Sequence, residues 1–149
     1  MNAQFLTSGD RKKLLEELKE IYGIDNVDYL FIQTNKERIR AFSGSLGRDE
    51  ILELDSMTRI ELLGTYFAKP EYGARLSFDM TQILASKITK SFIELTAEQA
   101  KEWMRGNGLA LASEKGIHVM HHGEDFLGVG YSDGEKLWNF VPKERRYRK

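Results

Sequence analysis

The chain of 149 residues contains no cysteine, only two prolines and no long apolar segment. The absence of cysteine excludes disulfides, thiolate metal sites and thiol nucleophiles. No apolar run approaches the ~20 residues that a membrane helix needs, and residues 1–7 lack the basic and apolar regions of a signal peptide. We therefore expect a cytoplasmic protein that is stabilised by packing alone and has no membrane partner.

Motifs for cofactor binding and catalysis are also missing. No strand-like segment is followed by G-x-G-x-x-G, no G-x-x-x-x-G-K-[ST] is present, and no serine lies in a recognisable nucleophile motif with a histidine. His118, His121 and His122 lie close together, but neighbours on a strand point to opposite faces, so we interpret them as residues of a strand and turn. We expect no cofactor, no metal and no catalytic residue.

The last segment, residues 136–149, concentrates positive charge. Six Lys and Arg residues and one Glu give it a net charge of +5, and because the whole chain carries −1, residues 1–135 carry −6. Trp138, Phe140 and Tyr147 interleave with the cations, and this mixture suits a flexible polyanion whose bases can stack. The pattern favours a nucleic acid as the partner. The cations are Lys136, Lys143, Arg145, Arg146, Arg148 and Lys149.

Apolar spacing in the first half predicts both helices and strands. A polar cap within residues 7–10 precedes an amphipathic helix over residues 9–22, which Gly23 ends. Residues 27–33 and 38–42 are typical of a hairpin. The other elements predicted in this half are the hairpin turn at Asn35 and Lys36, a helix from Asp49 with Ile51, Leu52, Leu54 and Met57 on its apolar side, strands over residues 59–67 and 75–79, and a short helix over residues 80–85.

The second half indicates short strands around one capped helix. Thr96 and Gln99 form a Thr-x-x-Gln capping pattern, which predicts a helix over residues 97–104, with Trp103 as a core anchor. A small barrel would bring strands so close that glycine is needed, and Gly128 and Gly130 suit such a position. Strands are predicted over residues 92–95, 109–112, 116–120, 127–131 and 138–141.

This half resembles a PUA domain, an RNA-binding pseudo-barrel of about this length. The resemblance rests on the order of strand, capped helix, Gly-Asn-Gly at residues 106–108, strand, and Gly-Val-Gly at residues 128–130. The sequence KLWNFVPKERR at residues 136–146 is similar to the K-x-x-N-x-x-P-K-x-x-R signature that closes the PUA-like domain of Nop/Sun-type RNA cytosine-5 methyltransferases. In the first half, residues 63–69 and 75–77 resemble the pre-PUA domain of the Nip-type large-subunit ribosome-biogenesis factor.

These resemblances imply an α+β fold, with a small N-terminal α/β (pre-PUA-like) domain over residues 1–87 and a PUA-like β pseudo-barrel over residues 88–149. They imply a non-catalytic protein that binds rRNA or tRNA in ribosome biogenesis, rRNA processing or RNA modification. The methyltransferase reaction needs a cysteine thiolate, which the chain lacks. The predicted RNA-binding residues are Lys136, Trp138, Asn139, Lys143, Arg145, Arg146, Arg148 and Lys149.

Two alternatives stay open at this point. The acidic first domain could dock a basic ribosome-assembly or RNA-processing protein, which would make the chain a protein-interaction adaptor. The chain could also supply in trans the RNA-binding domain of a separate RNA methyltransferase. At single positions, Trp138 suits packing and RNA stacking equally, and Asn139 and Pro142 also suit a purely structural turn.

Overall fold

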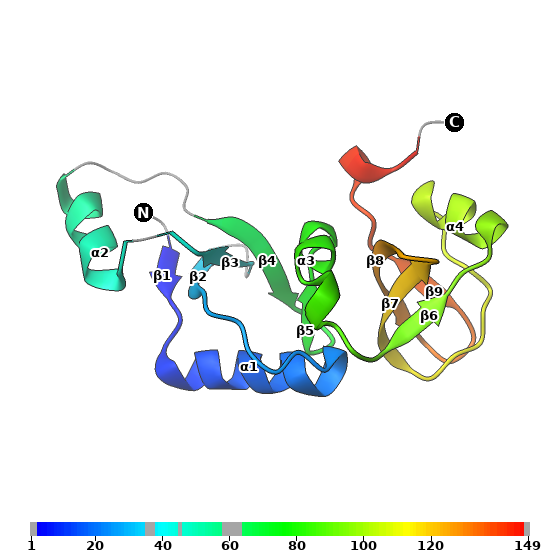
Figure 1. Ribbon diagram of the computed structural model, residues 1–149, viewed down its shortest axis with the longest axis horizontal. Helices are drawn as coiled ribbons and strands as arrows, with labels where there is room; N and C mark the ends of the chain where they lie inside the picture. The colour runs from blue at the N-terminus through cyan, green and yellow to red at the C-terminus, as the bar shows by residue number, and fades with distance from the viewer. Residues whose placement is uncertain (1–2, 35–37, 45, 58–63, 148–149) are drawn as a thin grey trace.

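The computed structural model describes residues 3–34, 38–44, 46–57 and 64–147, and it combines helices with two sheets (Figure 1). The N-terminal sheet is antiparallel, with the order β1-β2-β3-β4-β5, and the C-terminal sheet has the order β6-β7-β8-β9, in which β6 and β7 are parallel. The mixed α+β class is thus confirmed. The strands are β1 Ala3–Phe5, β2 Leu30–Thr34, β3 Ile39–Phe42, β4 Thr65–Pro70, β5 Ala74–Leu76, β6 Phe92–Glu94, β7 Gly116–His122, β8 Asp125–Ser132 and β9 Leu137–Asn139.

The helices lie where local capping signals place them. Thr7 accepts a hydrogen bond from the Asp10 backbone N–H and caps α1, Ser8–Tyr22, which ends at Gly23 in the left-handed conformation with φ 71°. Thr96 and Gln99 form the predicted capping box of α4, Ala97–Met104. Both predicted helices are confirmed. The other helical elements are α2 Arg48–Met57, α3 Phe78–Ile83, and the 3-10 turns η1 Ala85–Lys87 and η2 Lys143–Arg145.

Several predictions for the first half need correction. The predicted strand over residues 75–79 ends at Leu76, because the Ser77 hydroxyl accepts a hydrogen bond from Met80 N at 3.2 Å and so starts α3. On α2 only Ile51 is buried, so the predicted apolar side is wrong: Leu52, Leu54 and Met57 are exposed. The hairpin of β2 and β3 is confirmed. Its turn at Asn35 and Lys36, and most of the strand predicted over residues 59–67, lie outside the described residues.

In the second half the strand predicted over residues 109–112 is wrong. Leu109 forms one isolated bridge with Leu137, with N–H···O distances of 3.1 and 2.8 Å in the two directions. The fourth strand of the described C-terminal sheet is β6, which pairs with β7 and lies within the strand predicted over residues 92–95. The remaining predicted strands correspond to β6, β7, β8 and β9 with shifted ends.

The two sheets share one hydrophobic core. Leu18 and Tyr22 of α1 belong to the same buried cluster as Val119 of β7 and Val129 of β8. The Tyr22 hydroxyl donates to Ala74 O at 2.5 Å and accepts from Leu76 N at 3.0 Å, and burial raises the pKa of this phenol. In Figure 1, α3 stands between the two sheets and joins them.

The segment that connects the sheets is itself packed. Ile88 is buried in the shared cluster, Thr89 N donates to Tyr22 O at 2.9 Å, and the Ser91 hydroxyl donates to Ile21 O. The predicted domain boundary after residue 87 falls in this segment and stays a prediction. A second buried cluster lies within the C-terminal half around Trp103, which is completely buried and donates from Nε1 to Leu127 O at 2.7 Å. Trp103 is therefore a core anchor, as predicted.

Candidate nucleic-acid interface

A tight turn before β9 presents Lys136 and Trp138. Asp133 Oδ1 accepts hydrogen bonds from the backbone N–H groups of Lys136 and Glu135, each at 2.9 Å, and these bonds lower the pKa of the Asp133 carboxyl. Leu137 is buried, so strand alternation turns Trp138 outward, where it is 50% exposed. The Lys136 ammonium lies 4.3 Å from the centroid of the Trp138 ring. The Trp138 ring is therefore half-exposed and not packed in the core, and its role in stacking on RNA stays a prediction.

Beside Trp138 the surface forms a hollow of about 450 Å³, lined by Gly106, Gly108, Leu109, Lys136 and Trp138 among others. Gly106 has φ 92°, and a Cβ at Gly108 would lie 2.7 Å from Leu137 O. Glycine at these positions therefore lets the chain after α4 approach Leu137 and Arg146 more closely than a Cβ would allow. An aromatic ring, an ammonium group and open space meet here, which is the combination that a stacked base and its phosphate require.

Asn139 connects elements of the protein itself. Its Nδ2 donates to Trp103 O at 2.7 Å and to Asn107 O at 2.9 Å, and its Oδ1 accepts from Val141 N at 2.7 Å. Both amide donors are thus used within the chain. The structure gives Asn139 the turn-shaping role that the sequence left open, and a contact from its amide to RNA stays only a prediction.

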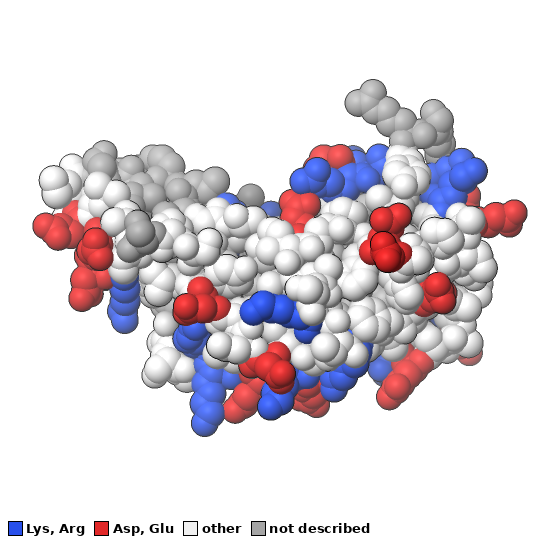
Figure 2. All heavy atoms as spheres, in the orientation of Figure 1, with Lys and Arg blue, Asp and Glu red and all other residues white. Residues whose placement is uncertain are grey.

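The basic end of the chain is held against the protein. Arg145 Nη2 lies 3.1 Å from each carboxylate oxygen of Asp79, and Arg146 Nε donates to Val141 O at 2.9 Å. Tyr147 N donates to Met104 O at 2.7 Å. Figure 2 shows Lys and Arg side chains gathered at this end of the molecule, over η2. The predicted residues Arg148 and Lys149 lie outside the described residues.

The comparison with protein families bears on this part of the chain. Residues 90–147 match the family model of the methyltransferase RsmF PUA domain. The match begins just before β6 and includes α4, the whole C-terminal sheet and η2. It supports a PUA-like domain here, and because a PUA domain binds RNA, it is consistent with RNA binding. None of the curated proteins matches the chain with significance.

Gly128 and Gly130, the two glycines of β8, pack closely against other parts of the protein. Gly128 has φ 78°, and a Cβ there would lie 2.7 Å from the Phe78 ring of α3. A Cβ at Gly130 would lie 2.5 Å from Trp103 and 3.0 Å from Trp138 O. The predicted close approach is confirmed, although the neighbours are mainly aromatic rings. The buried indole of Trp103 thus packs on one side of Gly130, and the backbone of the exposed Trp138 lies on another.

Two cations at the end of α4, which were not among the predicted residues, also lie in the PUA-like domain. Lys101 and Arg105 are exposed near the end of this helix, and Arg105 Nη1 lies 2.7 Å from Glu102 Oε1. They lie next to the basic end because Tyr147 bonds to Met104. In the sequence, residues 97–105 carry both acidic and basic side chains, so they do not stand out as a basic surface. Only the fold shows that Lys101 and Arg105 lie beside the basic end of the chain.

The three histidines of the PUA-like domain each contact a backbone carbonyl. His118 Nε2 lies 2.6 Å from Glu114 O, His121 Nδ1 lies 3.1 Å from Gly123 O, and His122 Nδ1 lies 2.8 Å from Leu95 O. His121 and His122 belong to β7, so the turn begins only after them. Across the described ranges, no group of three or more His, Cys, Asp or Glu residues is placed to hold a metal ion.

Within the part of the chain that the structure describes, no helix is both long enough and apolar enough to cross a bilayer.

Proposed function

We propose that the chain is a non-catalytic RNA-binding protein that acts in ribosome biogenesis or in rRNA or tRNA modification, and that it binds RNA through its PUA-like domain. The observation that carries the proposal is the exposed Trp138 under the Lys136 ammonium, at the edge of a hollow in a domain that matches a PUA family. A base stacks on the indole, and the ammonium neutralises a neighbouring phosphate.

The remaining cations extend this surface. Lys143 is exposed on η2, and Arg145 and Arg146 are held in place by Asp79 and by the Val141 carbonyl. Fixed arginines lose little side-chain freedom when they bind phosphate, which favours affinity without base specificity. The proposed recognition is therefore tolerant of sequence and sensitive to salt.

A second candidate is a subunit that supplies RNA binding in trans to a separate methyltransferase. The family model matched by residues 90–147 describes a domain of a methyltransferase, which supports this candidate. The absence of cysteine supports a division of labour, because the chain has no thiolate to attack cytosine. Co-purification of the chain with an RNA methyltransferase from its own cells is the expected result for this candidate.

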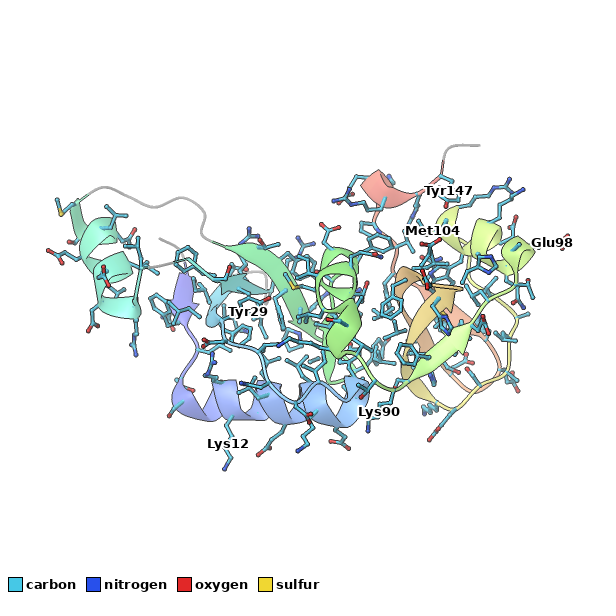
Figure 3. The ribbon with its side chains drawn as sticks, viewed as in Figure 1. Lys12, Tyr29, Lys90, Glu98, Met104 and Tyr147 are labelled. Carbon is cyan, nitrogen blue, oxygen red and sulfur yellow. The ribbon has the colours of Figure 1, made fainter. Side chains whose placement is uncertain are left out.

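A charge-reversal experiment tests RNA binding. The double variant Lys136→Glu/Lys143→Glu is compared with Lys12→Glu/Lys13→Glu, which makes the same change of net charge on the exposed face of α1. Figure 3 shows Lys12 pointing away from the body of the protein, far from Tyr147. Binding of a labelled 15-nucleotide single-stranded RNA is measured by fluorescence anisotropy at several salt concentrations.

The wild-type Kd should rise steeply with salt, by about 0.7 log units per phosphate contact for each tenfold increase. The Lys136→Glu/Lys143→Glu protein should bind at least ~10-fold more weakly, with a salt slope lower by about 1.4, because two phosphate contacts are lost. The α1 control should remain within about twofold of wild type. Equal losses in both double variants would show that only net charge matters and would remove the proposed site.

A further inference from the structure

A second cavity lies between the N-terminal sheet and the PUA-like domain. It encloses about 400 Å³ and is lined from both sides. Figure 2 shows the outline of the molecule dipping between the part that carries α2 and the part that carries η2. We call it the inter-sheet cleft; the lining residues used below are Arg38, Tyr66 and Arg75 on one side and Phe140, Arg145 and Arg146 on the other.

The inter-sheet cleft is rich in arginine. Its four arginines face only two lining carboxylates, those of Asp79 and Glu144, so the lining carries net positive charge. Low-dielectric walls around such a cleft strengthen its attraction for anions. The volume falls within the range of about 300–1,000 Å³ that is usual for sites that hold a small molecule. A single nucleotide is a ligand of this size, and its negative phosphate complements the net positive charge of the lining.

Two arginines of the cleft lie over aromatic rings. The Arg38 guanidinium lies 4.8 Å from the centroid of Tyr66, and the Arg75 guanidinium lies 4.1 Å from the centroid of Phe140. Arg75 Nε also lies 3.4 Å from a carboxylate oxygen of Glu71, but without the alignment of a hydrogen bond. Guanidinium planes and aromatic rings are the surfaces on which unpaired RNA bases stack.

The inter-sheet cleft adjoins the hollow beside Trp138. Asn139 lines both cavities. Arg146 lines the cleft, and a Cβ on Gly106, which lines the hollow, would lie 2.5 Å from Arg146 Nε. Asn139 and Arg146 therefore lie where the hollow and the cleft adjoin.

We infer that the inter-sheet cleft receives an unpaired nucleotide of the RNA that the PUA-like domain binds, so that the N-terminal sheet contributes directly to RNA recognition. The inference rests on the proposed function. Arg38 and Arg145 neutralise phosphates at the mouth of the cleft, and the base stacks against the Arg38–Tyr66 pair. A fully paired stem does not satisfy this site, because its bases are already stacked on each other.

The test separates charge from stacking. Arg38→Gln removes one charge, and Tyr66→Leu removes the ring but keeps the charge; Lys12→Gln is the matched charge control on α1. Anisotropy is measured with a 15-nucleotide oligouridine and with a blunt-ended, fully paired RNA duplex. Circular dichroism and thermal unfolding of each variant show that it is folded, and Arg38 is exposed, so its change leaves the core intact.

For oligouridine, Arg38→Gln should weaken binding about 5-fold and lower the salt slope by about 0.7, whereas Tyr66→Leu should weaken binding by a similar factor with an unchanged slope. Lys12→Gln should bind like wild type. The duplex should show no effect of Tyr66→Leu, because its bases are already stacked on each other. RNA that contains 4-thiouridine should crosslink to a peptide that contains β4.

The outcomes distinguish the inference from the proposed function. If Arg38→Gln and Tyr66→Leu bind oligouridine like wild type while Lys136→Glu/Lys143→Glu does not, the cleft is not a nucleotide site and the proposed function stands. A loss with Arg38→Gln but not with Tyr66→Leu overturns the stacked nucleotide. If the wild-type protein binds neither RNA, the proposed function fails and the inference falls with it.

Discussion

Tyr72 in the turn between β4 and β5 stacks on Tyr131 of β8, with ring centroids 3.9 Å apart and ring planes 15° apart. Tyr72 adopts φ 58°, a left-handed conformation that residues with a Cβ rarely adopt. The contact joins the N-terminal sheet to the PUA-like domain at the edge of their shared core, against which Tyr131 packs. The same turn leads into β5, where Arg75 lies over Phe140. The inter-sheet cleft therefore has walls that are fixed relative to each other.

The stack predicts energetic coupling between the two tyrosines. In a double-mutant cycle with Tyr72→Ala and Tyr131→Ala, the coupling free energy should be about 0.5–1.5 kcal/mol, as measured by urea unfolding. Tyr72→Gly removes the same ring but relieves the backbone strain, so it should be more stable than Tyr72→Ala by about 1 kcal/mol. Strictly additive free energies in the cycle would show that the rings do not stabilise each other.

The close packing around Gly130 predicts that a larger residue at this position destabilises the protein. In Gly130→Ala, the new Cβ would lie 2.5 Å from the Trp103 ring and 3.0 Å from Trp138 O, so the free energy of unfolding should fall by about 1–3 kcal/mol. The matched control is Gly9→Ala in the first turn of α1, where a Cβ meets no atom within 4 Å. Alanine there should be neutral or stabilising by up to about 1 kcal/mol. Equal stability of the two variants would contradict the close packing.

The elements that could be predicted from the sequence are those determined by interactions between residues close together in the chain. The cap at Thr7, the left-handed Gly23 and the Thr96–Gln99 capping box act over three or four residues, so they specify α1 and α4 without tertiary information. The tight packing of Gly128 and Gly130 was also predictable, because a glycine inside a strand signals a close approach. Which rings approach them was not.

The wrong predictions arise where a contact between residues far apart in the sequence determines the local structure. Residues 109–112 have apolar spacing like a strand, but only Leu109 finds a partner, at Leu137, so pairing stops there. The same limit applies to the interface: the sequence identifies the basic end, but Arg38 and Tyr66 become relevant only because Arg38, just before β3, and Tyr66 of β4 line the same cleft as Arg145 of η2. Asn139 looked available for RNA, although Trp103 O and Asn107 O occupy its amide.

Asp133 predicts a stability change in acid. Its folded pKa is lowered from 3.8, chiefly by the Lys136 N–H and then by the Glu135 N–H. The ionised carboxylate therefore contributes stability above about pH 3.8, and this contribution is lost as the pH falls through the lower folded pKa. Asp133→Asn keeps an acceptor but has no charge to titrate. Its free energy of unfolding, measured in urea between about pH 5 and 2, should fall less than that of wild type. Parallel pH curves would contradict the assignment.

The two tryptophans predict opposite responses to RNA. Trp103→Phe leaves Trp138 as the single tryptophan, and because that ring is half exposed under Lys136, bound RNA should quench its fluorescence and protect it from acrylamide. Trp138→Phe leaves the fully buried Trp103, whose emission should stay unchanged even at RNA concentrations that saturate the wild-type protein.

The Trp103→Phe variant is expected to be less stable than wild type, and this loss of stability has to be separated from any effect on RNA binding. It removes the Nε1–H bond to Leu127 O, so its free energy of unfolding should fall by about 1–3 kcal/mol, and titrations belong well below its melting temperature. Quenching of Trp138 in a folded Trp103→Phe protein would place RNA on the exposed indole. If only Trp103 responded, RNA would be acting through a change in the core, and the Trp138 platform would have to be abandoned.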